Sequence, residues 1–346
     1  MSVDSNFRIA ANAPKQLAGV CLSTGGRLFV NFPRWIDLPT PSVAEVLQDG
    51  SLVPYPNKAI NNWDLDPGAS ATEHFVCVQS VVADQNDMLW VLDPASPMFL
   101  KVIPSGPKLV RINLKTNNVE KIYTFDDASA PEQSYLNDVR FAHGSAFISD
   151  SGMGAIVVLN LATGKARRLL ADDASTKAEP DVEPIIGGRP WKFANGTTPQ
   201  VHADGIAIDP TGTYLYYKAL TARTLYRISI ESLLNETLSE AELGDCVERV
   251  AETQPSDGLE FDAHGNLYMT DLEESAIKVL RRDGQLETVA TSPEFQWPDT
   301  IAIGHDGDLL FSASQFHLMP AFNQGVDMRT PPYKVFRIDI SEITRS

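Results

Sequence analysis

Cysteine is scarce in this sequence. Its 346 residues include three cysteines, Cys21, Cys77 and Cys246, and no two of them have Cys-x-x-Cys spacing. An odd number at these separations makes neither a disulfide framework nor a zinc site. Cys21 and Cys77 lie in apolar, strand-like runs, so we expect both to be small core residues.

Long apolar runs and positive charge are also lacking. No apolar stretch approaches the roughly 20 residues that span a bilayer, and the first residues lack the charged-then-apolar pattern of a signal peptide. The net charge is −17, which would repel the phosphate backbone of a nucleic acid. We therefore expect a soluble monomer or weak homo-oligomer with no membrane and no nucleic-acid partner, and its compartment stays open.

Familiar catalytic and cofactor motifs are missing as well. The sequence contains no Gly-x-Ser-x-Gly, no His-Glu-x-x-His, no phosphate-binding loop and no dinucleotide fingerprint. We therefore expect no organic cofactor. Any chemistry on a small-molecule partner must come from residues that the fold brings together.

The prominent feature that is present is a repeat. A short apolar strand, a turn with Gly, Asp or Asn, and a second strand rich in aromatic and β-branched residues recur along the chain, and an alternating third strand follows. The copies are Leu17–Asn31, Val76–Asp93, Asn137–Asp150, Ala203–Tyr217, Ser256–Asp271 and Pro298–Ser314.

Six copies of an antiparallel meander predict an all-β fold, a six-bladed β-propeller with four-stranded antiparallel blades, with residues 1–346 as a single domain. One blade exposes both faces of its sheet, and a ring of blades buries them. The last copy supplies three strands, so we expect Asn6–Ala10 to add the fourth and close the ring.

The segments between the copies are irregular. Three of them are polar and rich in Pro, Gly and Asn, and we expect them to be loops over one face: Pro39–Asp66, Pro94–Pro107 and Asp172–Gln200. Glu231–Leu243 has an amphipathic pattern and is expected to be a short helical connector.

Acidic residues recur at one position of the repeat. The innermost strand of a blade runs beside the axis, so its first residues lie at one mouth of the channel. An Asp occupies this position in four copies, as Asp138, Asp204, Asp257 and Asp299. Asn137 and His202 are adjacent, and the earlier copies have Gln79 or Ser80, and Ala18 or Gly19.

Carboxylates that converge on one axis repel each other unless a cation, a proton or a hydrogen-bond network offsets the cost. Oxygen ligands of this type suit Ca²⁺ or another divalent cation such as Mg²⁺. For the set we therefore predict a functional pocket, although each Asp taken singly is more simply explained as the cap of a turn. A second set ends the second strands and is expected to cap turns on the opposite face: Asn31, Asp93, Asp150 and Asp271.

Several stretches resemble the major royal jelly protein/yellow family. They are GRLFVNFPRW at Gly26–Trp35, LWVLDPA at Leu89–Ala95, YLNDVRF and AFISDS in the third copy, and FQWPDTIAIGHDGDLLFSASQF at Phe295–Phe316. The resemblance runs from Gly19 to Ile340 and implies a six-bladed propeller. Yellow-type proteins include secreted structural or nutritive proteins, pigment-pathway enzymes and binders of small amines.

The amine binders of that family take pocket residues from the final blade. The resemblance therefore implies Thr300 and Phe316 as ligand-binding residues, with Ser314 where those proteins have Asn. The family's disulfide has no counterpart, because Gln85-Asn86 stands where a Cys is expected. Its absence is consistent with a reducing setting.

A more distant resemblance is to gluconolactonase/regucalcin-type propellers, whose channel metal is held by Glu, two Asn-type ligands and Asp. Asn137, Asp204 and Asp257 are similar in placement and are the implied metal ligands. Leu17–Gly19 occupies the region of the first-blade Glu. That ligand is therefore missing unless Asp299 replaces it.

The leading hypothesis is a hydrolase of lactone or ester type that acts on a small polar substrate at the channel mouth. A divalent cation polarises the carbonyl, and Asp299, Asp138 or His202 is the general base, although a structural role for His202 stays open. One alternative is an isomerase of the pigment-pathway type. The other is a non-catalytic binder whose aromatic rim holds an amine or an aromatic ligand: Trp63, Trp191, Phe295, Trp297 and Phe316.

Overall fold

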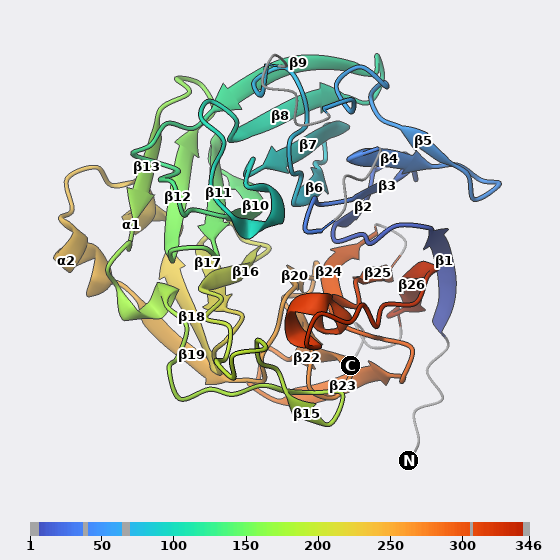
Figure 1. Ribbon diagram of the computed structural model, residues 1–346. Coiled ribbons are helices and arrows are strands. Elements are labelled where there is room, and N and C mark those ends of the chain that lie inside the picture. Colours follow the sequence, from blue (N-terminus) through green and yellow to red (C-terminus); the bar gives the residue numbers. More distant parts are fainter. Residues whose placement is uncertain (1–6, 37–40, 64–69, 305–306, 342–346) are drawn as a thin grey trace.

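Six four-stranded antiparallel sheets surround a central channel in the computed structural model, which confirms the six-bladed propeller (Figure 1). The structure describes residues 7–36, 41–63, 70–304 and 307–341. Each blade runs from an innermost strand beside the channel to an outermost strand at the rim. Neighbouring blades therefore bury the faces of each other's sheets.

The first three blades follow chain order. Blade 1 consists of β2 (Val20–Leu22), β3 (Leu28–Asn31), β4 (Val43–Val46) and β5 (Leu52–Pro54). Blade 2 consists of β6 (Ser80–Ala83), β7 (Met88–Asp93), β8 (Lys108–Asn113) and β9 (Asn118–Thr124). Blade 3 consists of β10 (Leu136–Ala142), β11 (Ser145–Asp150), β12 (Ala155–Asn160) and β13 (Ala166–Leu169).

The other three blades complete the ring. Blade 4 consists of β16 (Ala203–Ile208), β17 (Tyr214–Ala219), β18 (Thr224–Ser229) and β19 (Glu248–Glu252). Blade 5 consists of β20 (Leu259–Phe261), β21 (Leu267–Asp271), β22 (Ala276–Leu280) and β23 (Leu286–Thr291). Blade 6 consists of β24 (Pro298–Ile303), β25 (Asp308–Ala313), β26 (Tyr333–Asp339) and β1 (Phe7–Ala13).

The ring is closed by the N-terminal strand, as predicted. β1 pairs antiparallel with β26, from Phe7 opposite Ile338 to Ala13 opposite Tyr333, so the first strand of the chain completes the last blade. Asn6, the first residue of the expected strand, lies outside the described residues. The Phe7 ring packs edge-on against Phe295 in the core of that blade, with centroids 4.9 Å apart.

One expected loop is partly sheet. Pro39–Asp66 was expected to be irregular, but it contains β4 and β5, which complete blade 1. These strands have four and three residues, and an Asp49-Gly50 turn joins them, with Gly50 at a φ of +82°. The two ends of the expected loop, at 39–40 and 64–66, lie outside the described residues.

The other segments between blades hold short elements. Pro94–Pro107 contains the 3₁₀ turn η1 (Pro97–Phe99), and the segment before blade 4 contains η2 (Ala174–Thr176) and a small hairpin, β14 (Ile185–Ile186) with β15 (Arg189–Pro190). The expected connector is two helices, α1 (Ile230–Leu234) and α2 (Glu240–Gly244), and each begins after a serine N-cap. Two further 3₁₀ turns, η3 (Phe316–Leu318) and η4 (Pro320–Phe322), lie in front of the channel (Figure 1).

The core lies between the blades. Aromatic and branched side chains from adjacent sheets form the largest buried clusters. Cys21 is buried in one of them and Cys77 in a smaller cluster with Trp63, as expected, and burial raises the pKa of the Cys77 thiol to about 12. None of the helices in the described parts of the chain is long and apolar enough to cross a membrane.

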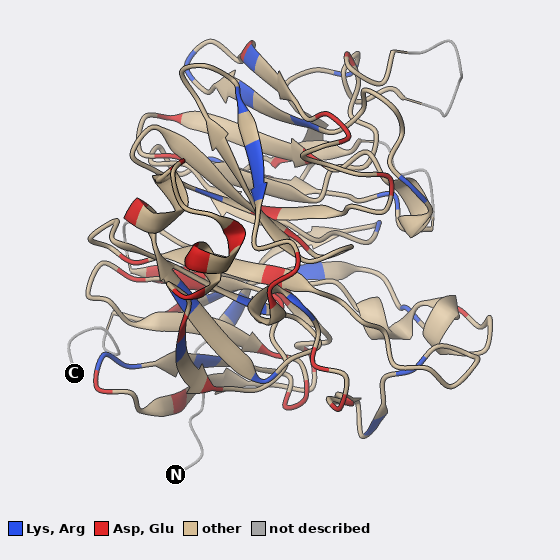
Figure 2. Cartoon of the chain, turned by 90° about the vertical axis from the view of Figure 1, so that its left-hand side faces the viewer, with Lys and Arg blue, Asp and Glu red and all other residues tan. Residues whose placement is uncertain are grey.

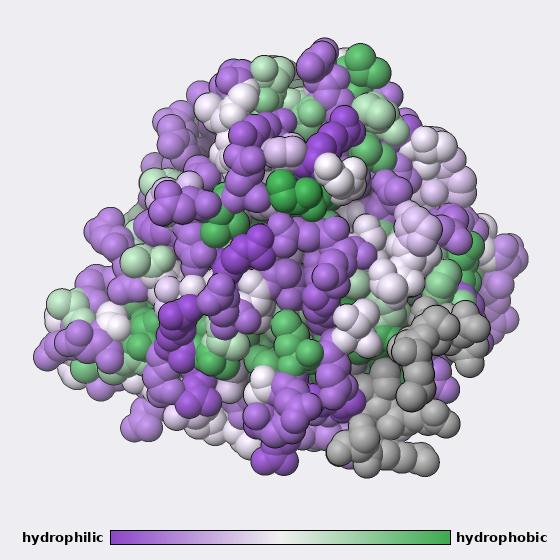
Figure 3. All heavy atoms as spheres, turned by 90° about the horizontal axis from the view of Figure 1, so that it is seen from below, coloured by the Kyte–Doolittle hydropathy of each residue, from purple (hydrophilic) through white to green (hydrophobic). Residues whose placement is uncertain are grey.

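The surface carries the charge. Acidic and basic side chains are interspersed over the blades (Figure 2). Seen from the side of the ring, hydrophilic residues cover most of the molecule, and hydrophobic residues form small separate groups (Figure 3).

Candidate functional site

The ring of residues at the channel mouth is set by the pairing of the two inner strands of each blade. Val139, Ile206 and Ile301 pair with the second strand at equivalent places, and the ladder shifts register just before each of them. A β-bulge of this kind re-aims side chains and often lies beside a functional site. The ring position is two residues before each of these paired residues. With the equivalent residues of the other blades, the ring consists of Ala18, Gln79, Asn137, Asp204, Asp257 and Asp299.

The predicted ring was therefore wrong by one residue in blade 3. Asn137 occupies the ring position there, and Asp138 follows it. The backbone supports this alignment, because the N–H of Asp138 donates to Ser149 Oγ just as the N–H of Thr300, the residue after Asp299, donates to Ser312 Oγ. The predicted members Asp204, Asp257 and Asp299 are confirmed at equivalent positions and line one cavity together with Asn137.

Two of the ring's carboxyl groups, Asp204 and Asp299, are buried, and the third, Asp257, is partly buried. Burial raises the pKa of Asp257 to about 6, although hydrogen bonds from Trp297 and Asp204 lower it in part. Burial, followed by the nearby charges of Asp257 and Asp299, raises the pKa of Asp204 well above its ordinary value. Burial and the charge of Asp257 do the same for Asp299. The side chains of Asp204 and Asp257 interact directly, and this interaction raises the pKa of Asp204 and lowers that of Asp257, so their titrations are linked.

A chain of hydrogen bonds fixes one side of the ring. The Asn137 amide donates to Asp204 Oδ2 and to Ser151 Oγ, both at 2.9 Å. Gln79 Nε2 donates to Asn137 Oδ1 at 3.4 Å, and the Tyr135 hydroxyl donates to Gln79 Oε1 at 2.8 Å. These contacts hold Asp204 in place through neutral groups from blades 2 and 3.

Aromatic side chains form the walls and the cover of this cavity, which has a volume of about 60 Å³. They come from the loops over the channel mouth and from the chain just before each inner strand. The aromatic lining residues are Trp35, Phe99, Tyr135, Trp191, Trp297 and Phe316. Loops from Pro94–Pro107 and Asp172–Gln200 thus lie over one face, as expected.

Trp297 joins the wall to the carboxyl pair. Its Nε1 donates to Asp257 Oδ2 at 2.7 Å, and its ring lies 4.9 Å from that of Trp191. Its backbone φ is +59°, a left-handed conformation that costs a non-glycine residue roughly 1–2 kcal/mol. Strain of this kind is retained where the surrounding structure needs the side chain in one place.

Two predicted catalytic residues lie outside the cavity lining. The His202 Nδ1 accepts a hydrogen bond from the backbone N–H of Ala178 at 3.0 Å, and burial lowers the pKa of the ring. Asp138 is occupied by Arg140, at 2.8 Å, and by the Ser80 hydroxyl. Neither side chain is among the described residues that surround the cavity.

The predicted ligand-binding residues divide into two groups. Trp297 and Phe316 line the cavity. Thr300 and Ser314 instead support Asp299: the Thr300 hydroxyl donates to Asp299 Oδ1 at 3.4 Å, and the buried Ser314 hydroxyl lowers the pKa of Asp299 in part. Both therefore act behind the lining.

Two members of the predicted aromatic rim also lie elsewhere. Trp63 stacks under the Arg34 guanidinium, which is 5.1 Å from its ring. Phe295 packs in the core of blade 6, against Phe311 and Phe336. The sequence reasoning missed Trp35, Phe99 and Tyr135, although Trp35 and Tyr135 belong to stretches that carry the family resemblance.

The second acidic set lies at the same end of the channel as the ring, so the expected opposite face was wrong. In antiparallel pairing the end of the second strand meets the start of the first, as Asp150 opposite Leu136 shows. The expected capping role holds for the aspartates: Asp93 accepts backbone N–H groups of Val76 and Cys77, and Asp150 accepts that of Tyr135. Asn31 instead donates its amide to the Val78 carbonyl.

The arrangement of the ring does not match a metal centre. Within the described residues, no group of three or more His, Cys, Asp or Glu side chains is placed to hold a metal ion. Asp204 faces Asp257 and the Asn137 amide donor, and Asp257 also accepts from Trp297. These contacts occupy carboxylate oxygens that an ion would need.

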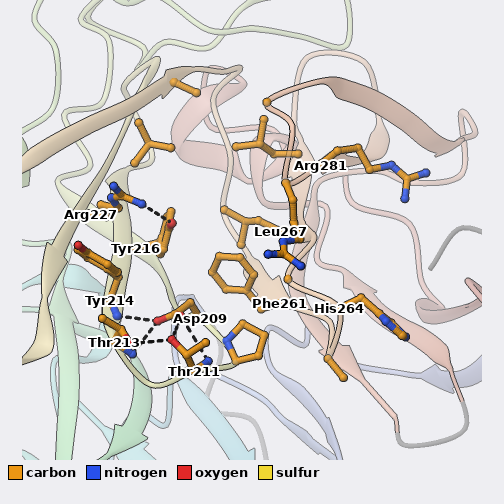
Figure 4. Close-up of a pocket in the computed structure, with 18 residues that line it drawn as sticks. Asp209, Thr211, Thr213, Tyr214, Tyr216, Arg227, Phe261, His264, Leu267 and Arg281 are labelled. Carbon is orange, nitrogen blue, oxygen red and sulfur yellow. Dashed lines mark hydrogen bonds between the residues drawn. The ribbon is translucent and has the colours of Figure 1, made fainter. Parts of the chain in front are cut away.

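Two further hollows lie away from the channel-mouth cavity. A groove of about 600 Å³ between blades 4 and 5 is lined by Tyr216, Phe261 and Arg227 (Figure 4). Two of its polar side chains are engaged elsewhere, because Arg227 bonds to Tyr216 and Glu248, and Asp209 caps its own turn. A funnel of about 660 Å³ lies around the turns of the inner strands and includes Glu260.

Comparison with curated protein sequences finds no match. Solved structures share the fold at low identity. Virginiamycin B lyase from Staphylococcus aureus has 13% identity and a TM-score of 0.55, over 97% of this chain and 99% of that chain. A gluconolactonase from Xanthomonas campestris has 11% and 0.56, over 97% and 90%. A luciferin-regenerating enzyme has 11% and 0.57, over 96% and 95%.

At such identities the likeness concerns the fold alone. Family membership rests on a separate finding, a match of residues 76–345 to the model of the major royal jelly protein family. The matched stretch contains blades 2 to 5 and three strands of blade 6, which include the whole acidic part of the ring. This chain therefore belongs to the major royal jelly protein family.

Proposed function

We propose that the protein hydrolyses a small lactone or ester in the channel-mouth cavity, with Asp204 and Asp257 as its acid–base pair. The observation that carries the proposal is the meeting of these two carboxyl groups in the lining of one cavity, where both pKa values are raised, that of Asp257 to about 6. Carboxyls whose environments separate their pKa values serve as acid and base in many enzymes. One structure of similar fold is a gluconolactonase, which makes lactones the first substrates to try.

The reaction needs two proton transfers. Asp257, ionised above about pH 6, accepts a proton from water as the water oxygen attacks the carbonyl carbon. Asp204, kept protonated by burial and by the charges of Asp257 and Asp299, gives its proton to the ester oxygen as the carbon–oxygen bond breaks. The products are a carboxylic acid and an alcohol. The hydrogen bond between the carboxyls then returns the proton to Asp204.

The surroundings position this pair. Trp297 Nε1 holds Asp257 at 2.7 Å, and Asn137 holds Asp204 at 2.9 Å. The aromatic walls keep bulk water away, which strengthens the interaction of the carboxyls with a developing charge.

The divalent cation expected from the sequence enters the proposal as an added component. Its ligands would be Asn137, Asp204 and Asp257, but these side chains bond to each other and to Trp297 in the arrangement described. The mechanism therefore has no step through a cation, and assays with and without Ca²⁺ decide whether one takes part.

Binding of a small amine is a second candidate, and the aromatic walls favour it. Ring faces of Trp35, Trp191 and Phe316 surround buried carboxyls, and an ammonium group is attracted both to aromatic faces and to carboxylates. In this case the cavity binds a ligand without changing it.

Turnover of a lactone and ester panel tests the first proposal. The parent, Asp257→Asn and the control Glu252→Gln are compared, with and without added Ca²⁺, Mg²⁺, Mn²⁺ and Zn²⁺. Glu252 is an exposed carboxylate of the outer strand of blade 4. We expect Asp257→Asn to lose about 10²-fold or more in rate, the usual contribution of a general base, and Glu252→Gln to match the parent.

Two results would contradict hydrolysis. One is no turnover above background with any metal, and the other is equal rates for Asp257→Asn and the parent. In either case, a thermal shift caused by small amines and lost in Asp257→Asn would support the binding candidate.

A further inference from the structure

The channel-mouth cavity is narrow in the arrangement described. Its volume of about 60 Å³ has room for a few water molecules, whereas sites for small molecules typically have about 300–1,000 Å³. A lactone with substituents does not fit without movement of the walls. The question is which part of the cover moves.

Phe99 is the least confined aromatic residue of the cover. Its side chain is 45% exposed, whereas Trp35, Trp191 and Trp297 are 6% exposed or less. Phe99 has no polar atom with which to anchor itself. It is held by ring contacts alone, at 4.9 Å from Tyr135, 5.9 Å from Phe316 and 6.0 Å from Trp35.

Polar bonds fix several of the other walls. Trp35 Nε1 donates to the Tyr135 hydroxyl at 2.9 Å, and Trp297 Nε1 donates to Asp257. Moving either indole would leave buried polar groups without partners, which costs about 1–3 kcal/mol for each group. Moving Phe99 breaks no hydrogen bond of its side chain.

The segment that carries Phe99 stores backbone strain. Twelve non-glycine residues have a positive φ in the described parts of the chain, and four of them lie within Pro94–Pro107. These are Ala95 (+51°), Met98 (+58°), Phe99 (+54°) and Ser105 (+61°). Left-handed backbone costs a non-glycine residue roughly 1–2 kcal/mol. A second conformation of this segment that relieves the strain therefore gains this energy.

The segment is anchored on both sides of Phe99. Met98 N–H donates to the Arg34 carbonyl at 2.7 Å, and Val102 N–H donates to the Glu132 carbonyl at 2.8 Å. Between them, Leu100 N–H donates within the segment, to Pro97, and the Leu100 side chain is 71% exposed. The tip can therefore change its conformation while its two ends stay attached.

We propose that Phe99 is the gate of the channel-mouth cavity and the residue that sets the size of ligand it admits. In the closed state its ring narrows the cavity that Asp204 and Asp257 line. In the open state the tip between Met98 and Val102 turns outward and joins the cavity to solvent. The size limit rests on the proposed function for its choice of ligand, but the gate itself is tested without a substrate.

The substrate-free test is acrylamide quenching of tryptophan fluorescence. Three of the five tryptophans line the cavity, and Trp35 lies directly against Phe99. We expect Phe99→Ala to raise the quenching constant several-fold, while Phe99→Tyr and the control Leu100→Ala stay at the parent value. Equal quenching of Phe99→Ala and Leu100→Ala would overturn the gate, even if the protein is an active hydrolase.

The size limit is tested with unsubstituted and alkyl-substituted γ-lactones. We expect kcat/KM to fall with substituent size in the parent and in Leu100→Ala, and the fall to be much smaller in Phe99→Ala. An unchanged size profile in Phe99→Ala overturns the size limit. If no lactone is turned over by any variant, the proposed hydrolysis fails, and the quenching result alone then decides for or against the gate.

Discussion

Among single residues, Lys218 lies in an environment that is costly for a charged side chain. Its side chain is fully buried in blade 4, where it donates to Thr253 Oγ1 and to the Gln254 carbonyl. No carboxylate lies within ion-pair distance of it in the described parts of the chain. Burial lowers its pKa to about 7 from an ordinary 10.5. The unfolded chain therefore binds more protons than the folded protein between these two values.

Lys218→Met is expected to stabilise the protein. The penalty for the buried charge is full below about pH 7 and fades as the pH rises towards 10, so the gain is largest in acid. At pH 6 we expect a gain of about 1–3 kcal/mol in the free energy of unfolding, after the loss of the hydrogen bonds to Thr253 and Gln254. Urea unfolding at pH 6 and pH 10 measures it.

Lys278→Met is the matched control, and we expect it to lower the free energy of unfolding instead of raising it. Lys278 is paired with buried Asp271 at 2.7 Å, so its removal leaves a carboxylate uncompensated and should cost about 2–4 kcal/mol. A loss of stability in Lys218→Met at pH 6 would show that this lysine is compensated by groups other than those described above.

The residue scale also shows where sequence reasoning ends. The recurring Asp before the inner strand correctly located Asp204, Asp257 and Asp299. The bulge at the start of the inner strand made Asp138 look equivalent to them, when Asn137 holds that position. The burial that raises the pKa of Asp204 depends on loops that are far apart in the sequence and meet over the cavity. No local sequence pattern predicts that these loops meet.

At the scale of elements, the closing strand β1 is the clearest case. It is the only strand of blade 6 that comes from the start of the chain, so its pairing with β26 ties the two ends of the described chain together. Phe7 packs edge-on against Phe295 and Phe336 in the core of this blade.

Phe7→Ala should therefore destabilise the ring by about 2–3 kcal/mol, somewhat less than a fully buried Phe, because the ring is only partly covered. Ile9→Ala lies on the same strand with a side chain that is 46% exposed, and it should change stability by less than about 0.5 kcal/mol. Thermal unfolding of both variants measures the difference. Equal effects would mean that β1 does not close the ring through its buried face.

How well an element could be predicted depended on how strong its local sequence pattern is. The closing strand was predictable because a blade with three strands needs a fourth. β4 and β5 were missed because strands of four and three residues beside prolines give little alternation. The single expected connector is two helices, since Ser239 begins a second one with a capping box to Glu242.

At the scale of the whole molecule, the fold was the most predictable property. Six copies of one meander leave a ring as the arrangement that buries both faces of every blade, and the family match agrees with it. The site was less predictable, because its cover comes from loops that the repeat does not constrain. Trp35 and Phe99 meet over the cavity although they lie in different blades.

The central claim is that Asp257, in its buried pair with Asp204, is the base of the channel-mouth site. The pH dependence of kcat/KM for the best lactone tests it most directly, measured for the parent and for Asp257→Asn. We expect the parent rate to rise with an apparent pKa near 6 and then to level off, because Asp257 must lose its proton to act. Asp257→Asn should be slow and flat across this range. A parent profile that is level through pH 6, or the same acid limb in Asp257→Asn, would contradict the account.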